Sequence, residues 1–206
     1  MRIDSLVRTL VLAAACCGAT FAAVAAPSKA AGCADCHGKD GVSTHQDMPT
    51  LAGMPSISHE DQMAAYKAKE RPCAKVEFVG GDHPKGAKDD MCTIAGKLTD
   101  DEITELADYY AGLKFVAFKN TIDVAKAAAG KKYHAANCEK CHSKGGSSPE
   151  DDAGILAGQP KAYLTLAMKE LREGKRPMQE KKAPKIKALK DADAEALVEY
   201  YASGGK

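Results

Sequence analysis

Apolar residues recur at helical spacing toward the end of each half of the chain. The segment Thr99–Glu102 is a capping box, in which the threonine accepts from a helix amide and the glutamate reaches back to the threonine. One helical face after it carries Ile103, Leu106, Ala107 and Tyr110. In the second half, a helix that Gly174 closes carries Leu164, Met168 and Leu171, and the last helix buries Ala194, Leu197, Val198 and Tyr201. No run alternates as a strand would, so the pattern predicts an all-α protein.

The first 25 residues differ from the rest of the chain. Arg2 and Arg8 precede an apolar run that ends in an A-x-A arrangement at Ala23–Ala25. This pattern predicts a secretory signal peptide, residues 1–25. A membrane anchor would need about 20 uninterrupted apolar residues, and a lipoprotein is a weaker alternative at Cys16 and Cys17. We therefore expect an exported protein with no stable membrane insertion.

The remainder of the chain contains an internal repeat. At a constant separation of 105 residues, the pairs are Cys33 and Cys138, His37 and His142, Leu51–Gly53 and Leu156–Gly158, Pro55 and Pro160, and Arg71–Pro72 and Arg176–Pro177. The ends also match, Ala107–Ala111 with Val198–Ala202, at a separation of 91, so the first copy has about 14 extra residues after Pro72. We predict two domains related by duplication, 26–116 and 117–206, with a linker within 115–127.

Composition adds two constraints. The formal net charge is +1, which gives no reason to expect nucleic-acid binding. Aromatic residues make up only 5% and tryptophan is absent, so domains of this size bury little surface by themselves. Something other than side chains is expected to fill the middle of each domain.

Each repeat begins with Cys-x-x-Cys-His, the attachment motif of c-type haem. The motifs are Cys33, Cys36 and His37, and Cys138, Cys141 and His142. Two thiols can bond the two haem vinyl groups while the adjacent imidazole coordinates the iron, and the haem supplies the missing apolar core. A redox Cys-x-x-Cys would need a βαβ context, and structural zinc would join both cysteine pairs in one tetrahedral centre. We therefore predict two covalently bound haem c groups.

A methionine is the expected sixth iron ligand in each domain, because a thioether raises the reduction potential and closes the site. In the second domain we predict Met178, since its rival Met168 lies on an apolar helical stripe. In the first domain we predict Met91, which precedes the final helix. The other candidates there are Met48, Met54, Met63 and Cys73 as a thiolate.

The two cysteines outside the motifs lie in the inserted part of the first domain. Cys92 is next to Met91, and Cys73 is its only plausible partner. We predict a disulfide between them that pins the ligand-bearing segment. The remaining histidines lie in polar surroundings and are predicted to be surface residues: His45, His59, His83 and His134.

Three stretches of the second half carry a family resemblance: CEKCHSKGG, then ILAGQPKAYLTLAMKELREGKRPMQEKKAPKIKAL, and the ending LVEYYASG. They resemble the dihaem cytochrome subunit of flavocytochrome c sulfide dehydrogenase. The resemblance implies two tandem class-I-like cytochrome c domains in the periplasm, bound to a flavoprotein subunit. That partner would carry FAD and oxidise sulfide, and this chain would pass the electrons to a soluble carrier. The inserted loop and the pair Cys73 and Cys92 depart from the family pattern. The resemblance therefore specifies the sixth iron ligand of the first haem less well than that of the second.

Charge is distributed unevenly between the two predicted domains. Residues 26–116 hold 10 Lys and Arg against 15 Asp and Glu, while residues 117–206 hold 17 against 12. A basic collar surrounds Met178 and consists of Lys175, Arg176, Lys181, Lys182, Lys185, Lys187 and Lys190. It would steer an acidic partner, unless it is only a solvated face or attracts the other domain.

Two other classes of protein remain as alternatives: a free-standing dihaem cytochrome of the c-four type, serving a terminal oxidase, and a dihaem peroxidase. The peroxidase needs an open iron site, against which the paired methionines argue.

Overall fold

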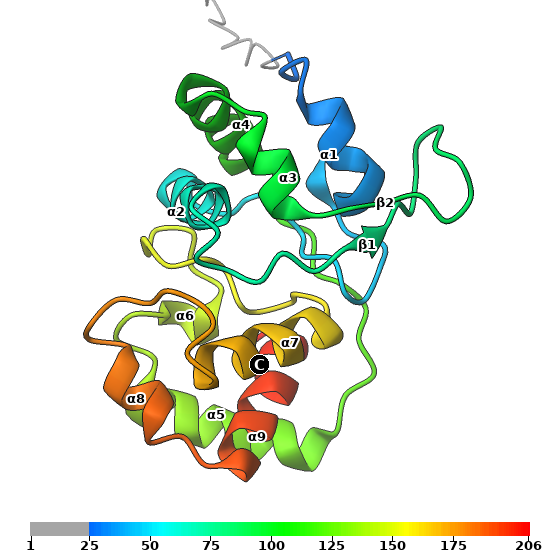
Figure 1. The fold of residues 1–206 in the computed structure, drawn as a ribbon. Helices are drawn as coiled ribbons and strands as arrows, with labels where there is room; N and C mark the ends of the chain where they lie inside the picture. The colour runs from blue at the N-terminus through cyan, green and yellow to red at the C-terminus, as the bar shows by residue number, and fades with distance from the viewer. Residues whose placement is uncertain (1–24) are drawn as a thin grey trace, which may run out of the picture.

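The computed structural model describes residues 25–206, so the predicted signal peptide lies outside the described residues except for Ala25. The first domain consists of α1 (Ala30–His37), a short 3-10 turn (Lys39–Gly41), α2 (Ser56–Lys67), β1 (Val76–Glu77), β2 (Lys88–Asp89), α3 (Met91–Gly96) and α4 (Asp100–Ala111). The second consists of α5 (Val124–Asn137), α6 (Ser143–Gly146), α7 (Lys161–Arg172), α8 (Ala183–Lys187) and α9 (Asp191–Ala202). Figure 1 shows the two groups of helices one above the other. The fold is all-α apart from β1 and β2, as predicted.

Helix α4 begins where the sequence places it. The hydroxyl of Thr99 accepts from the Glu102 amide at 3.2 Å, and the Glu102 carboxylate accepts from the Thr99 amide at 2.9 Å. Together these bonds satisfy two of the amides that every helix start leaves unpaired. The apolar face of α4 then packs in a core with Ala30 of α1, and this core contains Ala30, Leu98, Ile103, Leu106 and Tyr110.

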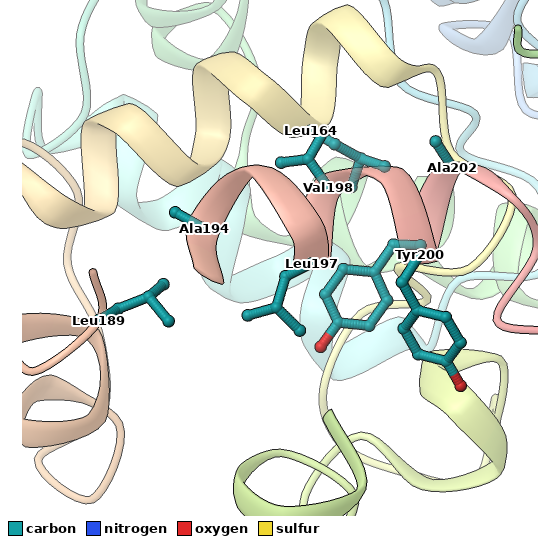
Figure 2. Packing of buried hydrophobic residues seen from close by; sticks show 8 residues of the cluster. Leu164, Leu189, Ala194, Leu197, Val198, Tyr200 and Ala202 are labelled. Carbon is teal, nitrogen blue, oxygen red and sulfur yellow. The ribbon is translucent and has the colours of Figure 1, made fainter. Parts of the chain in front are cut away.

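The second domain is built on the crossing of α5 and α9. A side chain at Gly130 would place its Cβ 2.0 Å from the carbonyl oxygen of Ala196, so the close approach of the two helices requires glycine at that position. Helix α7 covers the other side of α9. Figure 2 shows the resulting core, which contains Leu164, Leu189, Ala194, Leu197, Val198, Tyr200, Tyr201 and Ala202. The four residues predicted for the buried face of the last helix all belong to it.

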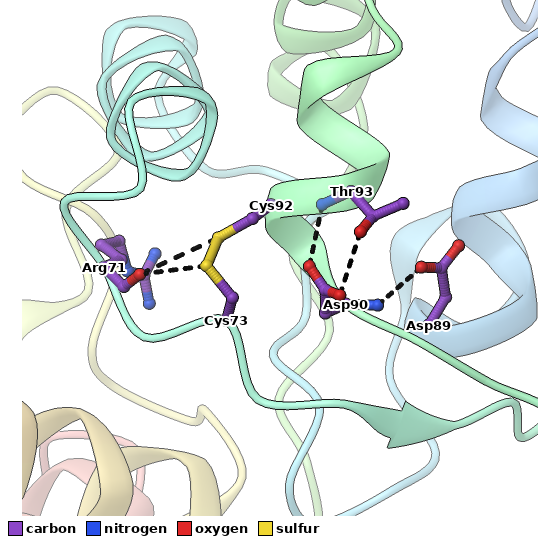
Figure 3. Close-up of a disulfide and its surroundings, with 6 residues drawn as sticks. All are labelled: Arg71, Cys73, Asp89, Asp90, Cys92 and Thr93. Carbon is purple, nitrogen blue, oxygen red and sulfur yellow. Dashed lines mark hydrogen bonds between the residues drawn. A yellow bond between two sulfur atoms is a disulfide. The ribbon is translucent and has the colours of Figure 1, made fainter.

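The inserted part of the first domain holds the strands that the sequence did not predict. β1 and β2 are antiparallel, with Val76 opposite Asp89 and Glu77 opposite Lys88. Two-residue strands are too short to show an alternating pattern. The disulfide between Cys73 and Cys92 closes this insertion, with the two Cα atoms 5.5 Å apart (Figure 3). It is the pair that the sequence singles out.

The linker is fixed to the second domain. Residues 114–123 belong to no helix or strand. The Asn120 side chain donates to the carbonyl oxygens of Gln159 and Ala202, both at 3.0 Å, and accepts from the Lys161 amide at 2.9 Å. The predicted boundary between residues 116 and 117 falls within this segment.

A buried polar contact joins the two domains. The Gln159 side chain accepts from the Thr50 amide and donates to the Thr50 carbonyl oxygen, both at 2.9 Å. Nearby, the guanidinium groups of Arg71 and Arg176 both donate to the Gln62 side chain, at 2.7 and 2.9 Å. The repeat relates Arg71 to Arg176, so equivalent residues of the two domains meet here.

No helix among residues 25–206 has the length and apolar character needed to cross a bilayer.

Candidate haem-binding sites

The first Cys-x-x-Cys-His motif lies on the last turns of α1. Helical spacing places Cys33 and Cys36 three residues apart on one face. Gly38 ends the helix with a φ of 80°, a conformation that favours glycine. Burial raises the pKa of both thiols.

His37 has one ring nitrogen committed to the protein and one free. Its side chain is buried, and Nδ1 lies 2.9 Å from the carbonyl oxygen of Pro49. Because a carbonyl can only accept, Nδ1 carries the proton and Nε2 keeps its lone pair. Burial also lowers the pKa of His37, which favours the neutral ring. This is the tautomer that an iron-ligating histidine uses, with its second nitrogen held by a backbone carbonyl.

The second motif has a different backbone. Cys138 is the C-terminal cap of α5, and His142 caps the start of α6, so the motif forms a turn rather than the end of a helix. The amides of Cys141 and His142 both donate to the Cys138 carbonyl oxygen, at 3.1 and 3.0 Å. Neither ring nitrogen of His142 bonds a described residue, and Nδ1 is buried without a partner. A half-buried imidazole of this kind fits a ligand that the chain itself does not supply.

His134 contacts this turn through Glu139 and is not the surface residue that the sequence predicts. It is only 1% exposed, with Nδ1 2.9 Å from the Tyr201 hydroxyl and Nε2 in contact with the Glu139 carboxylate. Glu139 also accepts from the amides of Lys144 and Gly145. His59 is a second correction, since it is half-buried and its Nε2 lies 3.1 Å from the Leu51 carbonyl oxygen. The polar neighbours of both histidines along the chain hid their burial.

The four motif cysteines are the free thiols of the described residues, and they form two separate pairs. Within residues 25–206, the cluster whose donor atoms come within 4.8 Å of one another is Cys73, Asp90 and Cys92, and its two sulfurs already share a disulfide. The motif cysteines therefore do not assemble the single tetrahedral centre that structural zinc requires. Two thiols beside an available imidazole, twice over, fit two covalently bound haems.

The predicted sixth ligands lie in the segments that precede the last helix of each domain. Met91 is half-buried at the start of α3, next to Cys92 of the disulfide. Asp90 caps this helix through the Thr93 amide at 2.8 Å (Figure 3). Met178 is half-buried between α7 and α8. Of the rivals, Met63 and Met168 pack against the two cores, and Met54 contacts Gln159 between the domains.

Positive charge is concentrated where the domains meet. The Arg71 and Arg176 side chains are 6% and 11% exposed, and both lie 3.9 Å from the single carboxylate of Glu170. The Nε of Arg71 is buried without a partner. Two buried guanidinium groups share one carboxylate, so one positive charge has no paired negative charge here. Haem carries two carboxylates that could balance it.

Comparison with known proteins agrees with this assignment. Residues 22–114 match the cytochrome c family, and residues 125–200 match the family of cytochrome c oxidase, cbb3-type, subunit III. The chain carries two cytochrome c domains in tandem. Two such domains imply two covalently bound haem c groups, and we conclude that this is a dihaem electron-transfer protein.

Individual relatives are similar over most of the chain. The thiosulfate dehydrogenase electron acceptor of Thiomonas intermedia (strain K12) is 29% identical over 81% of this chain and 76% of its own length. Cytochrome c4 of Azotobacter vinelandii is 29% identical over 75% and 74%. Among solved structures, reduced recombinant cytochrome c4 from Pseudomonas stutzeri aligns with a TM-score of 0.67 and 26% identity, over 85% of this chain and 94% of that one. Thiosulfate dehydrogenase (TsdBA) from Marichromatium purpuratum gives 0.62 and 26%, over 82% and 36%.

Proposed function

We propose that this chain accepts electrons from a partner enzyme that oxidises a reduced sulfur compound, and passes them to a soluble electron carrier. The observation that carries the proposal is the pair of sites in which two thiols adjoin an imidazole whose metal-binding nitrogen has no hydrogen-bond partner in the described residues. Two one-electron centres in one chain suit a donor that releases electrons in pairs.

The residues of each site have distinct tasks in this proposal. Cys33 and Cys36 hold the first haem, with His37 and Met91 as iron ligands. Cys138 and Cys141 would hold the second, with His142 and a residue of the segment that contains Met178 as iron ligands. Bound haem supplies a reversible one-electron centre, whose potential the ligands and burial tune. The Arg71–Arg176 pair is suited to the carboxylates of haem.

The donor is proposed by similarity. The resemblance of the second half to flavocytochrome c favours an FAD-containing flavoprotein that oxidises sulfide. A second candidate is a thiosulfate dehydrogenase, which the likeness to an electron acceptor of that enzyme favours. We place the exchange in the periplasm, reached through the predicted signal peptide. A free-standing shuttle to a terminal oxidase is the reading that the cytochrome c4 relatives favour.

Purification from the native host tests the proposal. We expect a red protein whose mass exceeds that of the processed chain by two haems, and which is reduced by sulfide only while a yellow flavoprotein is bound. Reduction by thiosulfate with a thiosulfate dehydrogenase, and no response to sulfide, would select the second donor. A protein reduced by neither system but oxidised by a terminal oxidase would favour the free-standing shuttle.

Two outcomes would refute the proposal. A colourless exported chain without added porphyrin mass would remove the basis for both sites. Peroxide turnover by the reduced protein would show an open iron site and favour the peroxidase.

A further inference from the structure

The repeat relates the segments that precede the last helix of each domain, but it does not pair Met91 with Met178. Helices α4 and α9 both span 12 residues, and their first residues, Asp100 and Asp191, are 91 apart. Leu98 and Leu189 precede these helices at the same separation, and both are buried. This separation relates Met91 to Lys182, whereas it relates Met178 to Ala87 in the inserted loop.

Local structure agrees with this equivalence. Met91 is the first residue of α3, and Lys182 is the residue that caps the start of α8. Both therefore lie at the start of the short helix that precedes the last helix of the domain, Met91 as its first residue and Lys182 one position before it. Met178 lies before this short helix, in a stretch that belongs to no helix or strand.

The Lys182 side chain differs from the other lysines of its segment. It is half-buried, whereas Lys181 and Lys185 are exposed. Its ammonium makes no hydrogen bond and no ion pair with residues 25–206. Its Nζ is therefore not committed to another described side chain and is available to a ligand that the polypeptide does not supply.

Lys182 lies beside the second haem motif. The charge of Lys182 acts on the imidazole of His142. The charge of Lys182 also acts on the Cys138 thiol. The side chain is thus within electrostatic reach of both a predicted thioether cysteine and the iron-ligating imidazole.

We propose that the Nζ of Lys182, rather than the sulfur of Met178, is the sixth ligand of the second haem iron. The amine gives its proton to solvent and forms a nitrogen–iron bond as a neutral donor. This inference rests on the proposed function, because it requires haem at the second motif. A thioether ligand raises the potential of a histidine-ligated haem. Replacing it with nitrogen in one domain therefore gives the two haems different potentials.

Absorption spectra of the oxidised holoprotein separate the two ligands. A methionine–iron bond gives a weak charge-transfer band in the red, which a lysine–iron bond lacks. We expect the wild-type band to correspond to one methionine-ligated haem for every two haems counted as pyridine haemochrome. Met178→Leu should leave the band unchanged, and Met91→Leu should remove it.

Substitutions at Lys182 give the opposite pattern. Lys182→Met should double the band and raise the lower of the two reduction potentials. Lys182→Arg keeps the charge but cannot supply a neutral amine, so the second haem should become high-spin or recruit Met178 and double the band. Lys181→Arg, at the exposed neighbour, is the matched control and should change nothing.

The haem count and the band report on different claims. Fewer than two haems per chain would refute the proposed function. With two haems present, a wild-type band that Met178→Leu halves, together with a Lys182→Arg spectrum like the wild type, would overturn the assignment of Lys182.

Discussion

The contact between Gln159 and Thr50 determines how firmly the two domains are joined. Gln159 follows the repeated Leu-Ala-Gly segment and is 1% exposed, while Thr50 is fully buried. The side-chain amide of Gln159 forms hydrogen bonds with both the backbone N–H and the backbone C=O of Thr50. The repeat places Met54 at the equivalent position of the first domain, and its sulfur lies 3.6 Å from the same amide. We predict that Gln159→Ala loosens the interface without disturbing either haem motif.

The cost follows from the two backbone groups that would lose their partner. A buried unsatisfied donor or acceptor costs about 1–3 kcal/mol, so the pair at Thr50 costs about 4 kcal/mol. For a chain of this size the loss corresponds to a fall in Tm of about 8–16 °C. Because the groups that join the domains are the ones affected, we also expect unfolding to separate into two transitions.

Urea and thermal unfolding of the holoprotein, followed by far-UV circular dichroism and by haem absorbance, measure these effects. Gln179→Ala is the matched control, since Gln179 is exposed and its side chain makes no hydrogen bond with the described residues. A loss below about 1 kcal/mol for Gln159→Ala, with one cooperative transition, would refute the reasoning that unsatisfied groups at Thr50 dominate.

Three further predictions concern other parts of the molecule. Replacing Cys73 and Cys92 by serine should cost about 3 kcal/mol in denaturant unfolding, because the disulfide closes a loop with a sequence separation of 19. Burial lowers the pKa of His59 from 6.5 to about 4. As the pH falls from 6.5 to about 4, the unfolded chain therefore binds a proton that the folded chain does not. Up to about 3 kcal/mol of the free energy of unfolding is lost over this range. Urea titrations of His59→Gln should show a shallower dependence there. Lys185→Glu with Lys187→Glu should slow reduction by an acidic donor at low salt, measured by stopped flow.

Each of these predictions has its own control. Alkylation of the unreduced wild type should label no thiol at positions 73 or 92, and labelling there would contradict the disulfide. His45→Gln changes an exposed histidine and should keep the wild-type pH dependence. Rates of reduction that do not change between low and high salt would exclude electrostatic steering by the basic collar that contains Lys185 and Lys187.

Local signals explain the parts of the fold that the sequence predicted. The capping box at Thr99, the apolar stripe of α9 and the glycine after α7 each depend on residues within a few positions of one another. The motif cysteines and histidines are equally local, which is why the thiols and imidazoles come together as expected. The two domains could be predicted because the same motifs occur in both halves of the chain at a constant separation.

The burial of His134 and the contact of Gln159 with Thr50 could not be predicted in this way. The ring of His134 is covered by Tyr201, 67 residues further along the chain, and Gln159 meets Thr50 across 109 residues. Whether a polar side chain is buried depends on partners that only the folded chain brings close. The repeat does not predict the burial of His134 either, because the equivalent residue of the first domain is Lys29, which is exposed.

Duplication made the two domains alike, and their differences lie mainly in the segments that face the haems. The first domain fixes its segment with a disulfide beside Met91, while the second has a basic segment with Lys182 at the equivalent position. Arg71 of the first domain and Arg176 of the second meet at Glu170. A nitrogen ligand on one side and a thioether on the other would make transfer downhill from the second haem to the first. The donor would then dock on the basic second domain, so that charge and potential favour the same direction of flow.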